Sequence, residues 1–307
     1  MAGTVDLKKP FLYYDELTRE RAYDARAERA GAAKFPSQGQ LKLLLGELYF
    51  LNKLLKRNLL QGAVVVYIGS APGRHIRYLR DHFYALNVRL RWVLIDGREH
   101  DRCLSGLEGV TILQRFVDES YLHKLRLRFQ GENVVLISDI RSMRGAEPTT
   151  DDLLRDYSLQ NSMVCILKPM ASSLKWRCPF PDQWVRDFYT VCGKEMLQPF
   201  APAYSAELRL LTFYDRAPVR LRCVTLETAH EYEKRMFYLN DIVRRSVVLN
   251  FDYPRQEYDF YHMFHLLNTI VCPRKFSSAK KKVLFLQQSI FNYLRIRAGA
   301  GASAASP

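Results

Sequence analysis

The chain has 307 residues, of which 48% are apolar, so it can bury a sizeable core without disulfides or a structural metal. Its net charge of +14 favours a polyanionic partner such as nucleic acid, because phosphate neutralisation releases counterions. The six cysteines include no Cys-x-x-Cys pair, and one of them, Cys165, falls in an apolar run expected to be a buried strand. These features predict reduced thiols, no zinc site and a cytosolic compartment.

The first predicted element is a helix over residues 41–60, which is apolar but interrupted by charges such as Lys42 and Glu47. These charges make it an amphipathic helix and exclude a membrane span. The N-terminus has no apolar core of a signal peptide and carries Ala2 in place of the glycine needed for myristoylation, so neither export nor a lipid anchor is expected.

A series of strands and helices follows. The short apolar runs 64–68, 91–95, 110–113, 134–137 and 163–167 are predicted strands. Their continuous apolar character is typical of strands covered on both faces, and therefore of a mostly parallel sheet. Helical patterns lie between them at 74–86, 121–129 and 151–160, and Thr149 with Asp151 and Asp152 caps the last of these. This alternation predicts a doubly wound α/β fold with helices on both faces of the sheet.

The pattern changes after Pro181. Residues 207–214 and 219–225 are predicted to form two strands joined by a turn at 215–218, which extend the sheet in the antiparallel sense. Residues 230–247 and 282–294 are predicted helices. The Ala/Gly/Ser-rich residues 298–307 are predicted to be a disordered tail.

A glycine-bounded turn, Gly69-Ser-Ala-Pro-Gly73, joins the first predicted strand to a helix, and Asp96 ends the second strand. The glycines allow a sharp turn and close approach of a ligand, and an acid at this position can accept hydrogen bonds from ribose hydroxyls. Alone, the turn fits a tight connection and Asp96 a helix cap. Together they predict a nucleoside cofactor site lined by Tyr67, Gly69, Gly73, Asp96 and Arg98.

Four charged residues adjoin the predicted strands or interrupt the first predicted helix. Asp139 follows a strand, Lys175 is expected in the loop after the next, Glu207 opens a further strand, and Lys42 interrupts an apolar helix face. Each alone fits a surface charge or an ion pair. Their order, Lys–Asp–Lys–Glu, combined with Gly-x-x-Pro-Gly, resembles the ribose 2′-O-methyltransferases.

Longer strings resemble the poxvirus cap-specific mRNA 2′-O-methyltransferases, a family that also provides the small, stimulatory subunit of the viral poly(A) polymerase. These strings are QGQLKLLLGEL at 38–48, VVYIGSAPG at 65–73, SSLKWRCPFPDQW at 172–184 and QPFAP at 198–202. The resemblance extends from about residue 9 to about residue 296. It implies one Rossmann-like methyltransferase domain over residues 1–297, with an N-terminal arm of about residues 1–36.

The resemblance also implies site residues. Lys42, Asp139, Lys175 and Glu207 would be catalytic, with Lys175 nearest the attacking hydroxyl as a base or as an orienting ammonium. The donor would be S-adenosyl-L-methionine, leaving S-adenosyl-L-homocysteine, bound by Gln40, Tyr67, Gly69, Gly73, Asp96, Arg98, Val117 and Asp139. Tyr23 and Phe180 would enclose the cationic 7-methylguanine ring, and Asp182 and Glu233 would accept its N–H groups. Arg177, Cys178, Pro179, Ser205, Ala206 and Glu207 would line the path of the cap and the first nucleotides.

The implied partners are capped, single-stranded mRNA and the catalytic subunit of the polymerase in a heterodimer, in the virion and the host cytoplasm, with no membrane. Two alternatives remain: an RNA-binding polymerase subunit without methyl transfer, and a 2′-O-methyltransferase for RNA without a cap. The complete Lys–Asp–Lys–Glu set argues against the first alternative. Tyr23, Phe180, Asp182 and Glu233 argue against the second, because only a cap-directed enzyme needs a methylguanine site.

Overall fold

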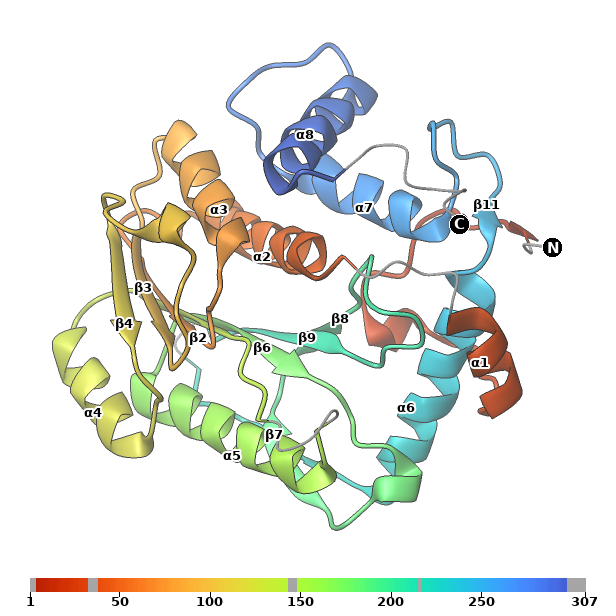
Figure 1. Cartoon of the computed structure of the whole chain (residues 1–307), viewed down its shortest axis with the longest axis horizontal. Coiled ribbons are helices and arrows are strands. Elements are labelled where there is room, and N and C mark those ends of the chain that lie inside the picture. Colours follow the sequence, from red (N-terminus) through yellow and green to blue (C-terminus); the bar gives the residue numbers. More distant parts are fainter. Residues whose placement is uncertain (1–3, 33–37, 143–147, 215–216, 297–307) are drawn as a thin grey trace, which may run out of the picture.

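The computed structural model describes residues 4–32, 38–142, 148–214 and 217–296. A central sheet separates two layers of helices (Figure 1). The helices are α1 (Ala25–Ala32), α2 (Gly39–Lys56), α3 (Arg74–Ala85), α4 (Glu119–Arg128), α5 (Thr150–Leu167), α6 (Leu226–Tyr238), α7 (Tyr258–Thr269) and α8 (Ala279–Leu294). α2 and α3 cover one face of the sheet, with α7 and α8 stacked outside them, and α4 and α5 cover the other.

The sheet has seven strands in the order β4-β3-β2-β5-β6-β9-β8. Their bounds are β2 (Val64–Ile68), β3 (Arg91–Asp96), β4 (Val110–Gln114), β5 (Val134–Ser138), β6 (Ala171–Trp176), β8 (Lys194–Met196) and β9 (Leu208–Phe213). The first five strands in this order are parallel, and β9 is antiparallel to both of its neighbours. Every residue of β2 and β5 is buried, as continuous apolar strands require. The predicted α/β class and the mostly parallel sheet are confirmed.

The prediction of a strand at 163–167 is wrong, because these residues form the last turn of α5. Thr149 caps the helix through a capping box with Asp152, and the helix runs until Lys168 adopts a left-handed conformation before Pro169. Cys165 accordingly lies exposed on a helix and not in a buried strand. The fifth parallel strand is β6, and Lys175 lies within it and not in a following loop.

The C-terminal half differs from the prediction in two further places. β10 (Leu221–Val224) pairs with β7 (Phe188–Val191) in a separate two-stranded sheet, so β9 and β10 are not a hairpin. The predicted helix 230–247 is α6 followed by a π-helical segment, Leu239–Val243, and β11 (Val247–Val248) then pairs with β1 (Thr4–Val5). Short 3₁₀ helices lie at Tyr14–Glu16, Arg102–Leu104 and Pro181–Gln183. The predicted tail, 298–307, lies outside the described residues.

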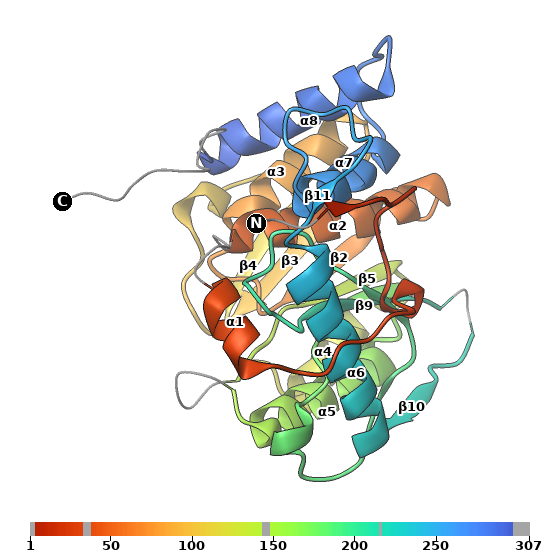
Figure 2. The same ribbon diagram turned by 90° about the vertical axis from the view of Figure 1, so that its right-hand side faces the viewer.

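The N-terminal segment crosses α6 before α1 begins (Figure 2). The Arg21 amide donates to the Lys234 carbonyl at 3.1 Å, and the ring of Tyr14 stacks on Tyr232 with centroids 4.0 Å apart. This segment therefore supplies side chains to the same side of the molecule as α6. Over the described parts of the chain, no helix combines the length and apolar character that a bilayer span requires.

Candidate active site

Four charged side chains meet at the carboxyl edge of β5 and β6. Lys42, from the first turns of α2, places Nζ 2.5 Å from Oε1 of Glu207, which directly precedes β9. Lys175 Nζ lies 3.4 Å from Asp139 Oδ1 and 3.4 Å from Glu207 Oε2. Residues 165 positions apart in the sequence thus form one cluster. In an open α/β sheet this edge is where ligands bind.

Arg209 is a fifth member of this cluster that the sequence analysis missed. Its guanidinium is buried, donates to Asp139 Oδ1 at 2.5 Å and to the Ser138 carbonyl at 3.0 Å, and receives support from Gln198. Gln198 also donates to Glu207 Oε1 at 3.3 Å. The sequence did contain a signal for Arg209, since it lies between leucines in an apolar strand and a buried guanidinium requires a partner. The cluster therefore contains three cations and two carboxylates.

Burial and neighbouring charges act in opposite directions on these groups. Burial disfavours the ionised form of Asp139, but Arg209 and Lys175 outweigh it and lower the pKa of that carboxyl. Burial is likewise outweighed at Glu207, whose pKa is lowered by Lys42 and Lys175. For Lys42, burial dominates over the attraction of Glu207, so the pKa of its ammonium is lowered. Both carboxylates are therefore ionised near neutrality and can hold the lysines in place.

The glycine turn between β2 and α3 touches the segment that carries Asp139. Gly69 has φ of +80°, and a Cβ there would lie 2.7 Å from the Ile140 amide nitrogen. Gly73 has φ of +70° at the start of α3, where a Cβ would lie 2.7 Å from the Ser70 carbonyl oxygen. Both positions require glycine. The turn is consequently packed closely against the segment that carries Asp139, beside the charged cluster.

Asp96 ends β3, as predicted, and connects it to the glycine turn. Its carboxylate accepts the amides of Ala71 and Arg98, each at 2.9 Å, and the Arg98 guanidinium at 3.0 Å. Burial opposes ionisation of Asp96, but the hydrogen bonds from Arg98 lower the pKa of the carboxyl. Phe116 lies close by, with its ring packed against Gly97 and 82% of its surface exposed. It precedes Val117, the only residue of this loop named from the sequence.

A buried network positions Gln40 and Tyr67. Gln40 Oε1 accepts the backbone N–H of His75 at 3.3 Å and lies 3.0 Å from Nδ1 of the His75 ring. The other ring nitrogen, His75 Nε2, lies 3.0 Å from Glu47 Oε2. Tyr67 donates to the other oxygen of Glu47 at 2.6 Å. Neither Glu47 nor His75 was named as a site residue from the sequence, although Glu47 interrupts an apolar helix as Lys42 does. The network fixes α2 relative to β2 and α3.

The predicted cap residues gather around a second feature, a cavity of about 230 Å³ between α6 and the segment after β6. Its lining includes Tyr23, Cys178, Pro179, Phe180, Asp182, Ala206 and Glu233, together with Glu28, Gln183, Tyr204, Ala229, Tyr232, Met236, Phe237 and Asn240. Arg177 and Ser205 are not among these lining residues. Tyr204 and Phe237, which stack with centroids 5.7 Å apart, were missed because aromatic residues in helices and loops usually belong to the core.

The cavity combines aromatic rings with acids. The Arg177 guanidinium lies 4.9 Å from the centroid of Phe180, so this ring already contacts one cation. Burial, and then the charge of Asp182, raises the pKa of the Glu233 carboxyl. Tyr23 donates to Glu28 at 2.6 Å and is 50% exposed. A flat cationic ligand would therefore meet aromatic faces and the carboxyl groups of Asp182 and Glu233.

Ser205, Ala206 and Glu207 connect the two features. Ala206 lines the cavity, and Glu207 belongs to the charged cluster. Ser205 Oγ accepts the Glu207 amide at 3.2 Å, and its carbonyl accepts Asn240 Nδ2 at 3.1 Å. Among the described residues, no group of histidine, cysteine, aspartate and glutamate is arranged to hold a metal ion. The site thus consists of a cavity, a charged cluster and a glycine turn in succession.

Comparisons with known proteins show the family of the chain. The sequence pattern of the family described as "Poly A polymerase regulatory subunit" matches residues 6–296. The cap-specific mRNA (nucleoside-2′-O-)-methyltransferase of myxoma virus (strain Lausanne) is 55% identical over 95% of this chain and 87% of its own length. The protein of the same name from fowlpox virus (strain NVSL) is 57% identical over 95% of this chain and 96% of its own.

Among solved structures, the multifunctional RNA-capping protein VP4 of bluetongue virus has a TM-score of 0.49 at 15% identity, covering 76% of this chain and 38% of VP4. With a family match over residues 6–296 and viral relatives more than half identical, the chain belongs to the poly(A) polymerase regulatory subunit family of cap-specific mRNA 2′-O-methyltransferases.

Proposed function

We propose that this protein methylates the ribose 2′-hydroxyl of the first transcribed nucleotide of capped mRNA, with S-adenosylmethionine as the donor. The observation that supports this proposal best is the convergence of Lys42, Asp139, Lys175 and Glu207 beside the glycine turn. A positioned acid or base contributes roughly 10²–10⁴-fold to such a transfer, because a sugar hydroxyl is a weak nucleophile near neutrality.

The residues around the glycine turn fit this donor. Gly69 lets the segment that carries Asp139 approach the turn closely, the Asp96 carboxylate stands where ribose hydroxyls would donate, and Phe116 and Val117 offer an apolar cover for adenine. The Arg98 side chain is 68% exposed, so it can yield its contacts with Asp96 to a nucleoside. When bound, S-adenosylmethionine would supply an electrophilic methyl carbon on its sulfonium, so that a C–O bond to the 2′-oxygen forms as the C–S bond breaks, S-adenosylhomocysteine leaves and the hydroxyl gives up its proton.

The chain's own side chains act on the hydroxyl. Lys175 is the cluster member assigned to contact it, because its ammonium is held between Asp139 and Glu207 at 3.4 Å from each. Lys42 pairs with Glu207 and Arg209 pairs with Asp139, both from the buried side of the cluster. Because these pairs already neutralise the two carboxylates, Lys175 remains available to contact the substrate. Holding the reacting groups in one geometry lowers the entropic barrier of the transfer.

The cavity is assigned to the 7-methylguanosine cap. Tyr23 and Phe180 provide aromatic faces for the cationic base, an attraction of about 2 kcal/mol when desolvated. Asp182 and Glu233 can accept hydrogen bonds from the guanine N–H edge, and a cation between them would relieve their mutual repulsion. Ser205 to Glu207, with Arg177, would then guide the RNA from the cavity to the charged cluster.

A second role follows from family membership: this chain serves as the regulatory subunit of a poly(A) polymerase. We expect it to form a heterodimer with the catalytic subunit and to bind single-stranded RNA, in the virion and the host cytoplasm. The complete charged cluster favours an active methyltransferase over a binding-only relative. The cavity likewise favours a capped substrate over ribosomal RNA.

One assay tests the methyltransferase function directly. Transfer of a labelled methyl group from S-adenosylmethionine would be measured with matched RNAs that carry a 7-methylguanosine cap, an unmethylated guanosine cap or no cap. Methylation of only the first RNA, at the first nucleotide, is expected. Equal methylation of all three would contradict a cap-directed enzyme, and no methylation of any would support a binding-only subunit.

A further inference from the structure

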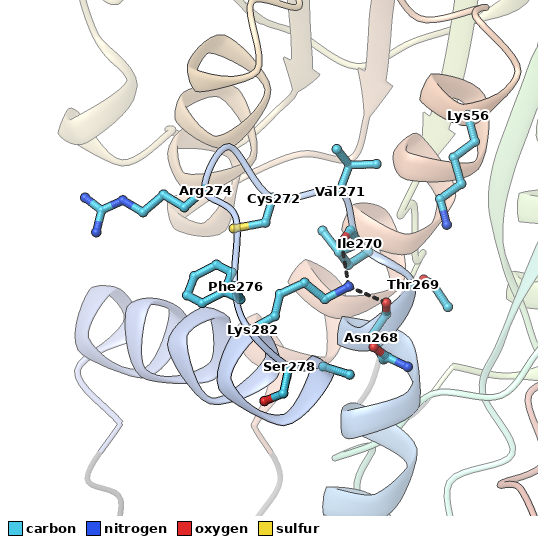
Figure 3. A pocket seen from close by; sticks show the side chains of 11 residues that line it. Lys56, Asn268, Thr269, Ile270, Val271, Cys272, Arg274, Phe276, Ser278 and Lys282 are labelled. Carbon is cyan, nitrogen blue, oxygen red and sulfur yellow. Dashed lines mark hydrogen bonds between the residues drawn. The ribbon is translucent and has the colours of Figure 1, made fainter.

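A second cavity, of about 450 Å³, lies away from the charged cluster, between the end of α2 and the start of α8 (Figure 3). It is lined by Lys56, Asn268, Thr269, Ile270, Val271, Cys272, Arg274, Phe276, Ser278, Ala279 and Lys282. This set contains three cationic side chains and no acidic one. Lys42 and Lys56 are 14 residues apart on α2, so about 21 Å of helix separates the two sites.

Two cations of this cavity, Lys56 and Lys282, repel each other. Lys282 Nζ donates to the carbonyls of Asn268 at 2.6 Å and Ile270 at 3.3 Å, which hold it at the cavity wall (Figure 3). Burial and then the nearby charge of Lys56 lower the pKa of the Lys282 ammonium. An anion between the two lysines would remove this repulsion.

The sequence at the start of α8 also points to an anion. Three consecutive lysines, 280–282, occupy the first turns of this 16-residue helix, where the helix dipole is positive, and its first turn contains no acidic residue. Lysines at this end destabilise a helix, whereas acids stabilise it. Of these three lysines, Asp252 offsets the charge of Lys280 alone, with its Oδ2 2.7 Å from Lys280 Nζ. A locally unfavourable choice of this kind is typical of a functional site.

The presence of Phe276 favours a nucleic acid over a simple anion as the ligand of this cavity. It lines the same cavity, is only partly buried, and packs on Phe285 with ring centroids 5.2 Å apart. Proteins that grip single strands without a sequence code combine basic side chains for the backbone with an aromatic platform for a base. Cations without acids, together with a partly exposed ring, match that combination.

We propose that this cavity is a second binding site for single-stranded RNA, in which Lys56 and Lys282 contact backbone phosphates and Phe276 contacts a base. The site is separate from the cap cavity and from methyl transfer. It would let the protein hold an RNA chain whether or not that chain carries a cap.

The test measures the affinity of the full chain for a short, uncapped, fluorescent oligoadenylate over a series of salt concentrations. Each phosphate contact on a single strand contributes a slope of roughly −0.7 to log K against log salt. The variant Lys56→Gln/Lys282→Gln should therefore have a slope shallower by about 1.4. The control Lys8→Gln/Lys124→Gln removes the same charge from two exposed positions elsewhere and should keep the wild-type slope.

Phe276→Ala gives an independent readout. It should weaken binding about tenfold at every salt concentration without changing the slope, because it removes stacking and no charge. Each variant's melting temperature is compared with the wild type. If the double variant melts early, the exposed Lys56→Gln alone should still change the slope by about 0.7.

Three results would overturn the proposal. The first is a slope and an affinity for the lysine variant that match those of the control. The second is loss of adenosine monophosphate or inorganic phosphate binding in that variant with RNA binding unchanged, which would assign the cavity to free phosphates. The third is loss of polymerase binding alone, which would make it a protein contact. All three readouts are independent of methyl transfer, which the variants should retain on a short capped RNA.

Discussion

Replacing Lys175 by methionine tests the central assignment, because this change removes the ammonium but keeps most of the side-chain length. Three cations and two carboxylates form the cluster, so two of each remain in the variant. The loss of two attractions at 3.4 Å is offset by relief of repulsion from Lys42 and Arg209. We expect the free energy of unfolding to change by about 1 kcal/mol, which shifts the melting temperature by roughly 2 °C in a chain of this size.

Activity should change far more than stability. Methyl transfer should fall by roughly 10²–10⁴-fold, because the hydroxyl loses its positioned contact. Affinity for S-adenosylhomocysteine should stay near the wild-type value, because Lys175 is not assigned to the adenosine site. Turnover, product affinity by calorimetry and melting temperature would be measured on one preparation.

Arg209→Met is the matched comparison, because Arg209 is buried behind the same carboxylate and does not face the substrate. Breaking a buried ion pair from one side costs about 3–5 kcal/mol, and the melting temperature should fall by roughly 5–8 °C. If Lys175→Met destabilises the protein as much as Arg209→Met, Lys175 has a structural role. Activity of Lys175→Met above about a tenth of wild type would remove it from the reaction.

Three further predictions follow from the other features. Phe180→Ala should weaken binding of 7-methylguanosine nucleotides far more than of guanosine nucleotides, and equal losses in a fluorescence titration would show that Phe180 only packs. Asp96→Ala should depress methyl transfer but leave tail elongation by the polymerase near normal; loss of both in a folded protein would mean that the two functions share the pocket. Burial lowers the pKa of His82 and of His262 from 6.5 to about 4, so the unfolded chain binds protons that the folded chain does not, and stability should fall as the pH drops below about 6.5. At pH 5 the expected loss is about 2 kcal/mol for each histidine, and His82→Gln/His262→Gln should reduce the loss measured by urea unfolding between pH 7 and pH 5.

The sequence predicted the strands whose apolar character is continuous and missed those whose character is mixed. β2, β3, β4 and β5 were placed within one or two residues of their observed bounds. β6, with the sequence Ala-Ser-Ser-Leu-Lys-Trp, has no β-branched residue, and its burial comes from its central place in the sheet. The apolar run at 163–167 suits a strand or a buried helix equally well by period, and the capping box at Thr149 should have extended the helix through it.

The residues of the candidate site could be predicted where a charged residue adjoins the end of a strand. Residues whose role depends on buried tertiary contacts were harder to predict. Asp96, Asp139 and Glu207 could be placed because each adjoins a strand end. Arg209 and His75 act through tertiary contacts, with Asp139 in one case and with Gln40 and Glu47 in the other, and no local spacing encodes those contacts. The proposed cap residues Tyr23 and Glu233 were named from family resemblance alone, since the chain brings them together only when its N-terminal segment crosses α6.

The single uninterrupted helix α2 sets a length requirement for the RNA. Because Lys42 and Lys56 lie on the same helix, their separation of about 21 Å cannot be changed by loop movement. Stacked nucleotides in one strand advance about 3.4 Å each, so a stacked RNA held at both positions would have about six nucleotides between them. Capped transcripts shorter than this would be methylated without engaging the far end of α2, whereas longer ones would be retained after the methyl group has been transferred.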